Sequence, residues 1–321
     1  MVSGKTGSNG NDTENTMNEM LILVRQISQM FLLGGLGYLL FRSGKVTEEG
    51  SRALGNILIY LALPATIING FLVERNAEHL LGILYSAIGA AALLLISMLI
   101  SRAFFRRDPI AAFAGAFSNP GFFGIPLIIA SVGQGAVFYV ACFIAFLNIG
   151  QWTYGVSLLT GQPIKQGLQW KKLIRAPFVI AIGIGLALFL TQVRLPSVIS
   201  GCLSTVASLN TPLAMFTVGI YLAQTNLRSM LTHRTVYLVA LVRLVIVPLV
   251  SLLLLSLLPA AYHDMKMALL LAIACPVGSN VAVYAHLHGK DYPYAVETVV
   301  ISTLFSIITI PAVVYIAGIM G

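Results

Sequence analysis

Apolar runs long enough to cross a lipid bilayer recur along almost the whole chain, and they constrain its fold more than any other feature. A helical span needs about 20 apolar residues. Hydrophobic residues make up 58% of the 321 positions and charged residues only 9%, whereas soluble domains carry about 25% charged residues. The sequence therefore predicts an all-α integral membrane protein that is surrounded by a lipid bilayer.

Counting the apolar runs predicts ten transmembrane helices. The expected spans are residues 20–42, 50–72, 79–105, 109–131, 135–160, 172–192, 196–224, 234–258, 264–287 and 293–319. Residues 1–19 are polar and rich in Gly, Asn and Thr, which predicts a disordered tail and not a cleavable signal peptide.

The distribution of basic residues predicts how the spans are oriented. Thirteen of the 19 lysines and arginines fall in loops on one face, five fall on the other face, and Arg243 is left inside a span. By the positive-inside rule the basic face is cytoplasmic, so both termini of this multi-pass cell-membrane protein are expected outside the cytoplasm. Topology thus explains the net charge of +8, and no nucleic-acid partner is expected.

Two apolar segments, 116–126 and 272–284, are interrupted by proline and glycine in the same way. A proline inside a helix removes a backbone donor and clashes with the preceding turn. Unpaired backbone groups are tolerated in a membrane only where protein or a wet cavity surrounds them. We therefore expect two broken helices that share one polar site.

The two halves of the sequence repeat each other. Residues 35–41 are similar to residues 183–189, and the same offset of 148 residues carries Pro64 onto Pro212, while Pro120 maps onto Pro276 at an offset of 156. Each unit has five spans, an odd number, so the second unit must enter the membrane inverted. The expected organisation is one unit over 20–160, a cytoplasmic linker over 161–171 and a second unit over 172–321. Inverted repeats with helices broken at matching positions are typical of secondary transporters.

Several segments resemble the auxin efflux carrier family of bacterial and plant transporters. They are residues 46–64, the break Asn119–Pro126, Cys275-Pro276, and the later His288-Gly289-Lys290-Asp291 and Ser302-Thr303. The resemblance implies ten helices in two inverted units, each with a three-helix scaffold and a two-helix transport unit, and a crossing of broken helices 4 and 9. It also implies substrates that are small organic anions, such as auxin in plants or malonate and malate in bacteria. Cys275-Pro276 stands where the plant carriers have a second Asn-Pro, which points away from auxin.

The residues at the two breaks are the first candidates for substrate binding. A helix N-terminus presents free N–H groups and about half a positive charge, which suits a carboxylate. The alternative is that the small residues here only allow close helix packing. The candidates are Ser118, Asn119, Pro120, Gly121, Pro276, Val277, Gly278, Ser279 and Asn280.

Polar residues inside other spans extend this set. Arg243 lies near mid-span, where a charge is costly and commonly functional; it could hold a substrate carboxylate, neutralise Glu297 or form a structural ion pair. Asn148 and Gln151, three residues apart, share one helix face and could line the cavity or bond between helices. Tyr284 is the remaining candidate.

Glu297, Asp291 and His286 are the candidates for coupling transport to a proton or sodium ion. Uptake of an anion against a negative interior is opposed by roughly 2.3 kcal/mol per charge per 100 mV, so uptake needs a coupled cation, whereas export does not. The simpler alternative is that these side chains are solvated at the cytoplasmic end of the bundle. His286 and His288 do not share a helix face, so no metal is expected, and nothing indicates a cofactor.

The function that these features favour is secondary transport of a small organic anion by alternating access, with the broken helices moving like an elevator against a scaffold. The alternative is a receptor or sensor that binds a ligand in the same pocket without moving it. No GxxxxGK[ST], GxSxG or HExxH pattern is present, so neither ATP-driven transport nor catalysis is expected. A homodimer remains open.

Overall fold

The computed structural model describes residues 8–164, 174–224 and 232–320, and this part of the chain is helical apart from loops and one isolated β-bridge. The first half contains α1 (Ser8–Arg42), α2 (Glu48–Ile57), η1 (Leu58–Ala62), α3 (Leu63–Gly70), α4 (Ala77–Phe104), α5 (Pro109–Ala116), η2 (Pro120–Gly124), α6 (Ile125–Ser131), η3 (Gln134–Ala136), α7 (Val137–Gly150), η4 (Gln151–Gly155) and α8 (Val156–Thr160). The second half contains α11 (Pro177–Thr191), α12 (Ser197–Ser208), α13 (Asn210–Gln224), α15 (Arg234–Leu241), η5 (Val242–Ile246), α16 (Val247–Leu255), η6 (Ala260–Tyr262), α17 (His263–Ala274), α18 (Asn280–Leu287) and α19 (Tyr292–Met320).

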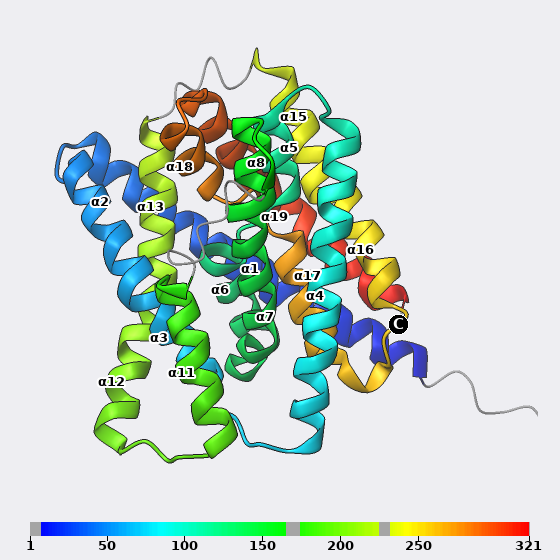
Figure 1. The fold of residues 1–321 in the computed structure, drawn as a ribbon. Helices are drawn as coiled ribbons and strands as arrows, with labels where there is room; N and C mark the ends of the chain where they lie inside the picture. Colours follow the sequence, from blue (N-terminus) through cyan, green and yellow to red (C-terminus); the bar gives the residue numbers. More distant parts are fainter. Residues whose placement is uncertain (1–7, 165–173, 225–231, 321) are drawn as a thin grey trace, which may run out of the picture.

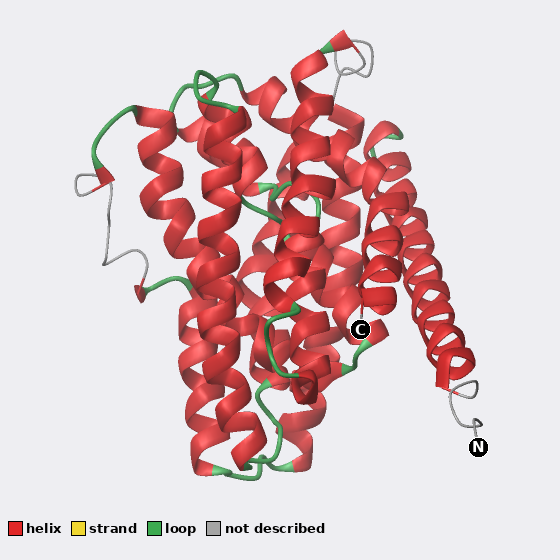
Figure 2. Ribbon diagram, turned by 90° about the vertical axis from the view of Figure 1, so that its right-hand side faces the viewer, coloured by secondary structure: helices red, strands yellow, loops and turns green. Residues whose placement is uncertain are grey.

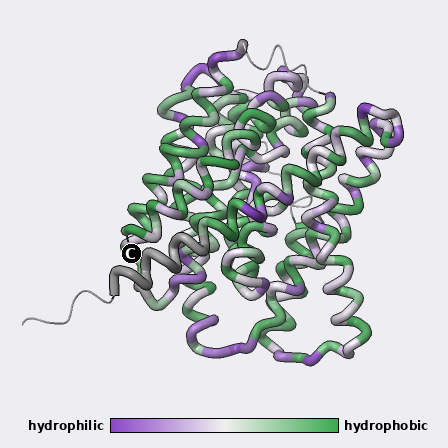
Figure 3. The backbone as a smooth tube through the Cα atoms, turned by 180° about the vertical axis from the view of Figure 1, so that it is seen from behind, coloured by the Kyte–Doolittle hydropathy of each residue, from purple (hydrophilic) through white to green (hydrophobic). Residues whose placement is uncertain are grey.

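Seven helical segments are long and apolar enough to cross a membrane, and they confirm the predicted all-α membrane class. They are Met20–Arg42, Glu48–Gly70, Ala77–Phe104, Gln134–Thr160, Ser197–Gln224, Arg234–Leu255 and Tyr292–Met320. Two shorter apolar helices cover Pro120–Ser131 and Pro177–Thr191. Most helices run along one direction (Figures 1 and 2), and hydrophilic segments gather at the two ends of the bundle while its middle is mostly hydrophobic (Figure 3).

Helix α1 extends beyond the N-terminal end of the first expected span. Helix α1 begins at Ser8, so residues 8–19 continue the first apolar helix as additional turns. Residues 1–7 and most of the expected linker, 161–171, lie outside the described residues.

The first two helical stretches of one half, α1 and α2–α3, pack against the first two of the other half, α11 and α12–α13. Helix α1 packs on α13, and α11 and α12 pack on α3. The contact between α1 and α13 is made by backbone, because a Cβ atom on Gly219 would overlap the carbonyl oxygen of Gly34. We refer to these stretches as one group and to α4–α8 together with α15–α19 as the other, and α1 also contacts α19 and α6 of the second group.

The helices of the second group are interrupted where two of them meet. Helix α5 begins after Asp108, whose Oδ1 accepts a hydrogen bond from the Ala111 N–H at 2.9 Å, a regular N-cap. It ends at Ala116, and the next helical residue is Pro120. Helix α17 ends at Ala274, and α18 begins at Asn280. Both gaps are buried, since Ser118 is 1% and Val277 0% exposed.

Candidate functional site

The two gaps cross each other and are joined by backbone hydrogen bonds. Ser118 and Val277 form an antiparallel β-bridge. The Asn119 N–H donates to the Pro276 carbonyl at 3.0 Å, and the Gly278 N–H donates to the Phe117 carbonyl at 2.9 Å. The bridge therefore satisfies backbone groups that the helix breaks set free, as burial in a membrane protein requires.

Gly278 is needed at the crossing because the two gap segments touch there. A Cβ atom at this position would lie 2.7 Å from the carbonyl oxygen of Ser118, a backbone atom that cannot turn away. The neighbouring Val277 N–H donates to Ser302 Oγ on α19 at 3.0 Å. Both the crossing and its attachment to α19 thus depend on small or polar side chains.

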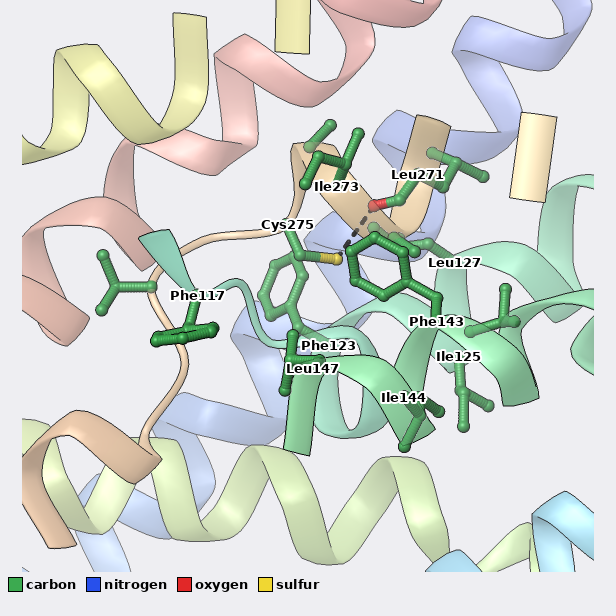
Figure 4. Close-up of a cluster of buried hydrophobic side chains, with 14 of the residues drawn as sticks. Phe117, Phe123, Ile125, Leu127, Phe143, Ile144, Leu147, Leu271, Ile273 and Cys275 are labelled. Carbon is green, nitrogen blue, oxygen red and sulfur yellow. Dashed lines mark hydrogen bonds between the residues drawn. The ribbon is translucent and has the colours of Figure 1, made fainter. Parts of the chain in front are cut away.

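A buried apolar cluster supports the crossing from one side. Cys275 Sγ contacts the Leu271 carbonyl at 3.1 Å, and side chains of α6, α7 and α17 surround it (Figure 4). A Cβ atom on Gly124 would lie 2.9 Å from that sulfur. Cys275 is therefore a packing residue, and its thiol faces no solvent.

A cavity of about 240 Å³ lies on the side of the crossing where η2 and α18 begin. Its walls come from both groups of helices: Ile59, Leu63 and the start of α11 on one side, and the crossing, α7, η4 and α18 on the other. Drug-sized ligands occupy pockets of about 300 Å³ or more, so this volume suits a smaller metabolite. A cavity between two packed groups is also well placed to open when one group moves.

The cavity offers hydrogen-bond donors with no partner of their own. Ser118 is 1% exposed, and its Oγ makes no hydrogen bond in the described part of the chain. The first N–H groups of the two helices that begin here, at Gly121 and Phe122 and at Ser279 and Asn280, have no backbone acceptor among the described residues. Free N–H groups of this kind are typical anion ligands.

The net electrostatic character of the cavity comes from the backbone. No Lys, Arg, Asp or Glu lines it among the described residues. Each helix N-terminus carries about half a positive charge, so the two that meet here supply about one unit. One carboxylate group would balance that charge.

Most of the residues predicted from the sequence to bind substrate line this cavity. They are Ser118, Asn119, Pro120, Gly121, Gly278, Ser279, Asn280, Asn148 and Tyr284. The Nδ2 of Asn148 donates to the Ile144 carbonyl of the preceding turn of α7 at 2.8 Å, so part of its hydrogen-bonding capacity is used within its own helix. The apolar and aromatic lining residues, among them Phe122, Trp152 and Phe178, carried no signal that distinguished them from ordinary membrane-facing residues.

Four predicted binding residues lie outside the cavity wall. Pro276 and Val277 take part through the backbone bridge. Gln151 is buried behind the wall, where its Oε1 accepts from Asn280 Nδ2 at 2.8 Å. Arg243 lies where α5 and α17 end, with its guanidinium against backbone carbonyls.

Of the alternatives for Arg243, a pairing with Glu297 is not found in the described part of the chain. Glu297 is 3% exposed and pairs with His233, whose Nδ1 lies 2.6 Å from its Oε2. The imidazole of His233 is half exposed and precedes α15. His233 lies directly before the expected span 234–258, and no sequence feature marked it as the partner of Glu297.

The other two coupling candidates lie at the surface. Asp291 is exposed, and its Oδ1 accepts from the Tyr294 N–H at 3.0 Å at the start of α19. His286 is exposed near the end of α18, and its ring packs against Tyr292 with 5.5 Å between centroids. None of the three candidates lines the cavity, and Glu297 is the buried one among them.

Comparison with known proteins agrees with these features. The model of a family described as "Membrane transport protein" matches residues 22–314. A protein of Rhizobium meliloti (strain 1021) named "Putative malonate transporter" is 27% identical over 297 residues, which cover 87% of this chain and 91% of that protein.

Proposed function

Because this chain belongs to the membrane transport protein family, we propose that it moves a small organic carboxylate across the membrane through the cavity at the crossing. The observation that carries the proposal is the pair of helix N-termini in the cavity wall whose first N–H groups have no backbone acceptor among the described residues, with the unbonded Ser118 Oγ buried beside them. The name of the Rhizobium relative suggests malonate as the first substrate to try.

The proposed architecture is ten spans in two inverted units of five. The seven long apolar helices, α11, and the two interrupted stretches α5–α6 and α17–α18 add up to that number. The packing supports an internal symmetry, because α1 of the first half packs on α13 of the second, and α11 of the second half packs on α3 of the first. In the same proposal the basic loops are cytoplasmic and both termini lie outside.

The position of the cavity supports alternating access in this proposal. Ile59, Leu63 and the start of α11 form one wall, and the crossing with α7, η4 and α18 forms the other. The bridge between Ser118 and Val277 ties the two broken stretches together, so we expect them to move as one body with the bound carboxylate. A proton carried by Glu297 is the proposed coupling ion, because this acid is buried and paired with a histidine that reaches solvent.

The test is uptake of labelled malonate into liposomes that contain the purified protein. Wild-type protein should accumulate label faster than empty liposomes do. Ser118→Ala should raise the KM about tenfold, because a hydrogen bond to a charged group contributes about 1.5–3 kcal/mol. Its melting temperature should not fall, since the hydroxyl has no partner to lose.

Ser251→Ala is the matched control. Ser251 Oγ is also buried without a partner among the described residues, but it lies in α16 away from the cavity. Its KM should stay at the wild-type value. Malonate binding without uptake would favour a receptor, and the absence of both binding and uptake for a panel of mono- and dicarboxylates would refute the proposal.

A further inference from the structure

Arg243 is a completely buried cation whose hydrogen bonds in the described part of the chain all go to oxygen atoms, while its Nε has no partner there. It is 0% exposed and lies in η5, a π-helical turn between α15 and α16. Its Nη1 donates to Ser97 Oγ at 3.0 Å, to the Gly115 carbonyl at 3.3 Å and to the Ala116 carbonyl at 3.1 Å. Its Nη2 donates to the carbonyl of Ile273. No carboxylate of the described chain contacts it.

The three carbonyls are the C-terminal ends of the two helices that stop at the crossing. Gly115 and Ala116 are the last residues of α5, and Ile273 is the second-last residue of α17. The final carbonyls of a helix have no partner within it, and each C-terminus carries about half a negative charge. The two ends therefore present about one negative unit, which one guanidinium balances.

The crossing thus has two electrostatic sides. Helix N-termini face the cavity, where an anion fits, and helix C-termini face Arg243. Rings of backbone carbonyls are also what binds monovalent metal cations in membrane proteins. The position of the guanidinium is chemically that of such a cation.

We propose that Arg243 is a built-in cation: its guanidinium fills a carbonyl-lined cation site at the crossing and holds the two helix ends, and with them the donors of the cavity, in register. Arg243 is then a positioning residue that does not touch substrate. The part of this inference that concerns cavity donors rests on the proposed function, whereas the cation site itself does not.

The test begins with thermal unfolding of Arg243→Ala in detergent, without substrate. Removing one partner from a buried, bonded charge is strongly destabilising, so the melting temperature should fall on the order of 10 °C. Millimolar guanidinium should restore at least half of that loss, sodium or lithium a smaller part, and choline none, because choline is too large for the site. Wild-type protein and the control Arg234→Ala, which removes an exposed arginine of α15, should not respond to these cations.

Two further variants decide the case if Arg243→Ala fails to fold. Arg243→Lys keeps the charge, and Arg243→Met keeps much of the length without it. The lysine variant should melt several degrees above the methionine variant; equal melting temperatures, or a methionine variant as stable as wild type, would overturn the proposal. So would an Arg243→Ala protein that no small cation stabilises.

Malonate binding gives a readout that a packing role would not move. In Arg243→Ala, guanidinium should restore binding in step with the melting temperature, whereas methionine at this position should not restore it. If wild-type protein neither binds nor moves malonate, the proposed function fails, but the unfolding data still decide whether the cation site exists.

Discussion

Gly278→Ala is the change that most directly tests the crossing. The added methyl group would lie 2.7 Å from the Ser118 carbonyl oxygen, so the two gap segments must separate. Separation breaks the hydrogen bonds from Asn119 to Pro276 and from Gly278 to Phe117. Each bond contributes about 1 kcal/mol, and a buried group left without a partner costs about 1–3 kcal/mol, so we expect a loss of roughly 3 kcal/mol.

That loss corresponds to a fall in melting temperature of about 6 °C, because proteins of 150–250 residues lose about 2–4 °C per kcal/mol and this chain of 321 residues lies at the low end. The assay is thermal unfolding of the detergent-purified protein, followed by malonate uptake in liposomes. Uptake should fall more than tenfold, because the donors at Ser279 and Asn280 shift with the bridge. Gly183→Ala is the control, since a Cβ there meets nothing within 4 Å and alanine favours a helix. A Gly278→Ala protein that melts and transports like wild type would show that the crossing tolerates separation, and the reasoning would be wrong.

Two further predictions concern charge. Asn280→Asp places a carboxylate where α18 begins and removes the donor to Gln151, so malonate affinity in a thermal-shift titration should fall at least tenfold by like-charge repulsion; affinity equal to wild type would place the substrate elsewhere. Glu297→Gln removes the buried partner of His233, so uptake should no longer accelerate when the liposome exterior is made acidic, whereas the exposed-site control Asp291→Asn should keep that response. If uptake by the Glu297→Gln protein still accelerates when the liposome exterior is acidic, Glu297 is not the coupling group.

The membrane class could be predicted from the sequence because it depends on local composition. Runs of about 20 apolar residues leave no alternative to helices in lipid, and the long helices that the structure describes lie within a few residues of the expected spans. Pro120 and Pro276 mark where interruptions are expected, because proline acts on its own backbone.

The partners of buried charges could not be predicted, because they come from distant parts of the chain. The position of Arg243 near the middle of an expected span indicated that it lies within the membrane. Its contacts, however, are 146 residues away at Ser97 and 30 residues away at Ile273. The partner of Glu297 lies 64 residues away, outside any apolar run. Only packing determines which of several polar groups at one depth meet, and a single sequence does not record that packing.

The backbone contact between α1 and α13 bears on how the protein is made. Gly34 on α1 meets Gly219 so closely that no side chain fits between them, and some 180 residues separate the two along the chain. During synthesis the surface of α1 around Gly34 therefore lacks this partner helix until α13 has been made. A chain that stops before Asn210 has no α13 to cover that surface.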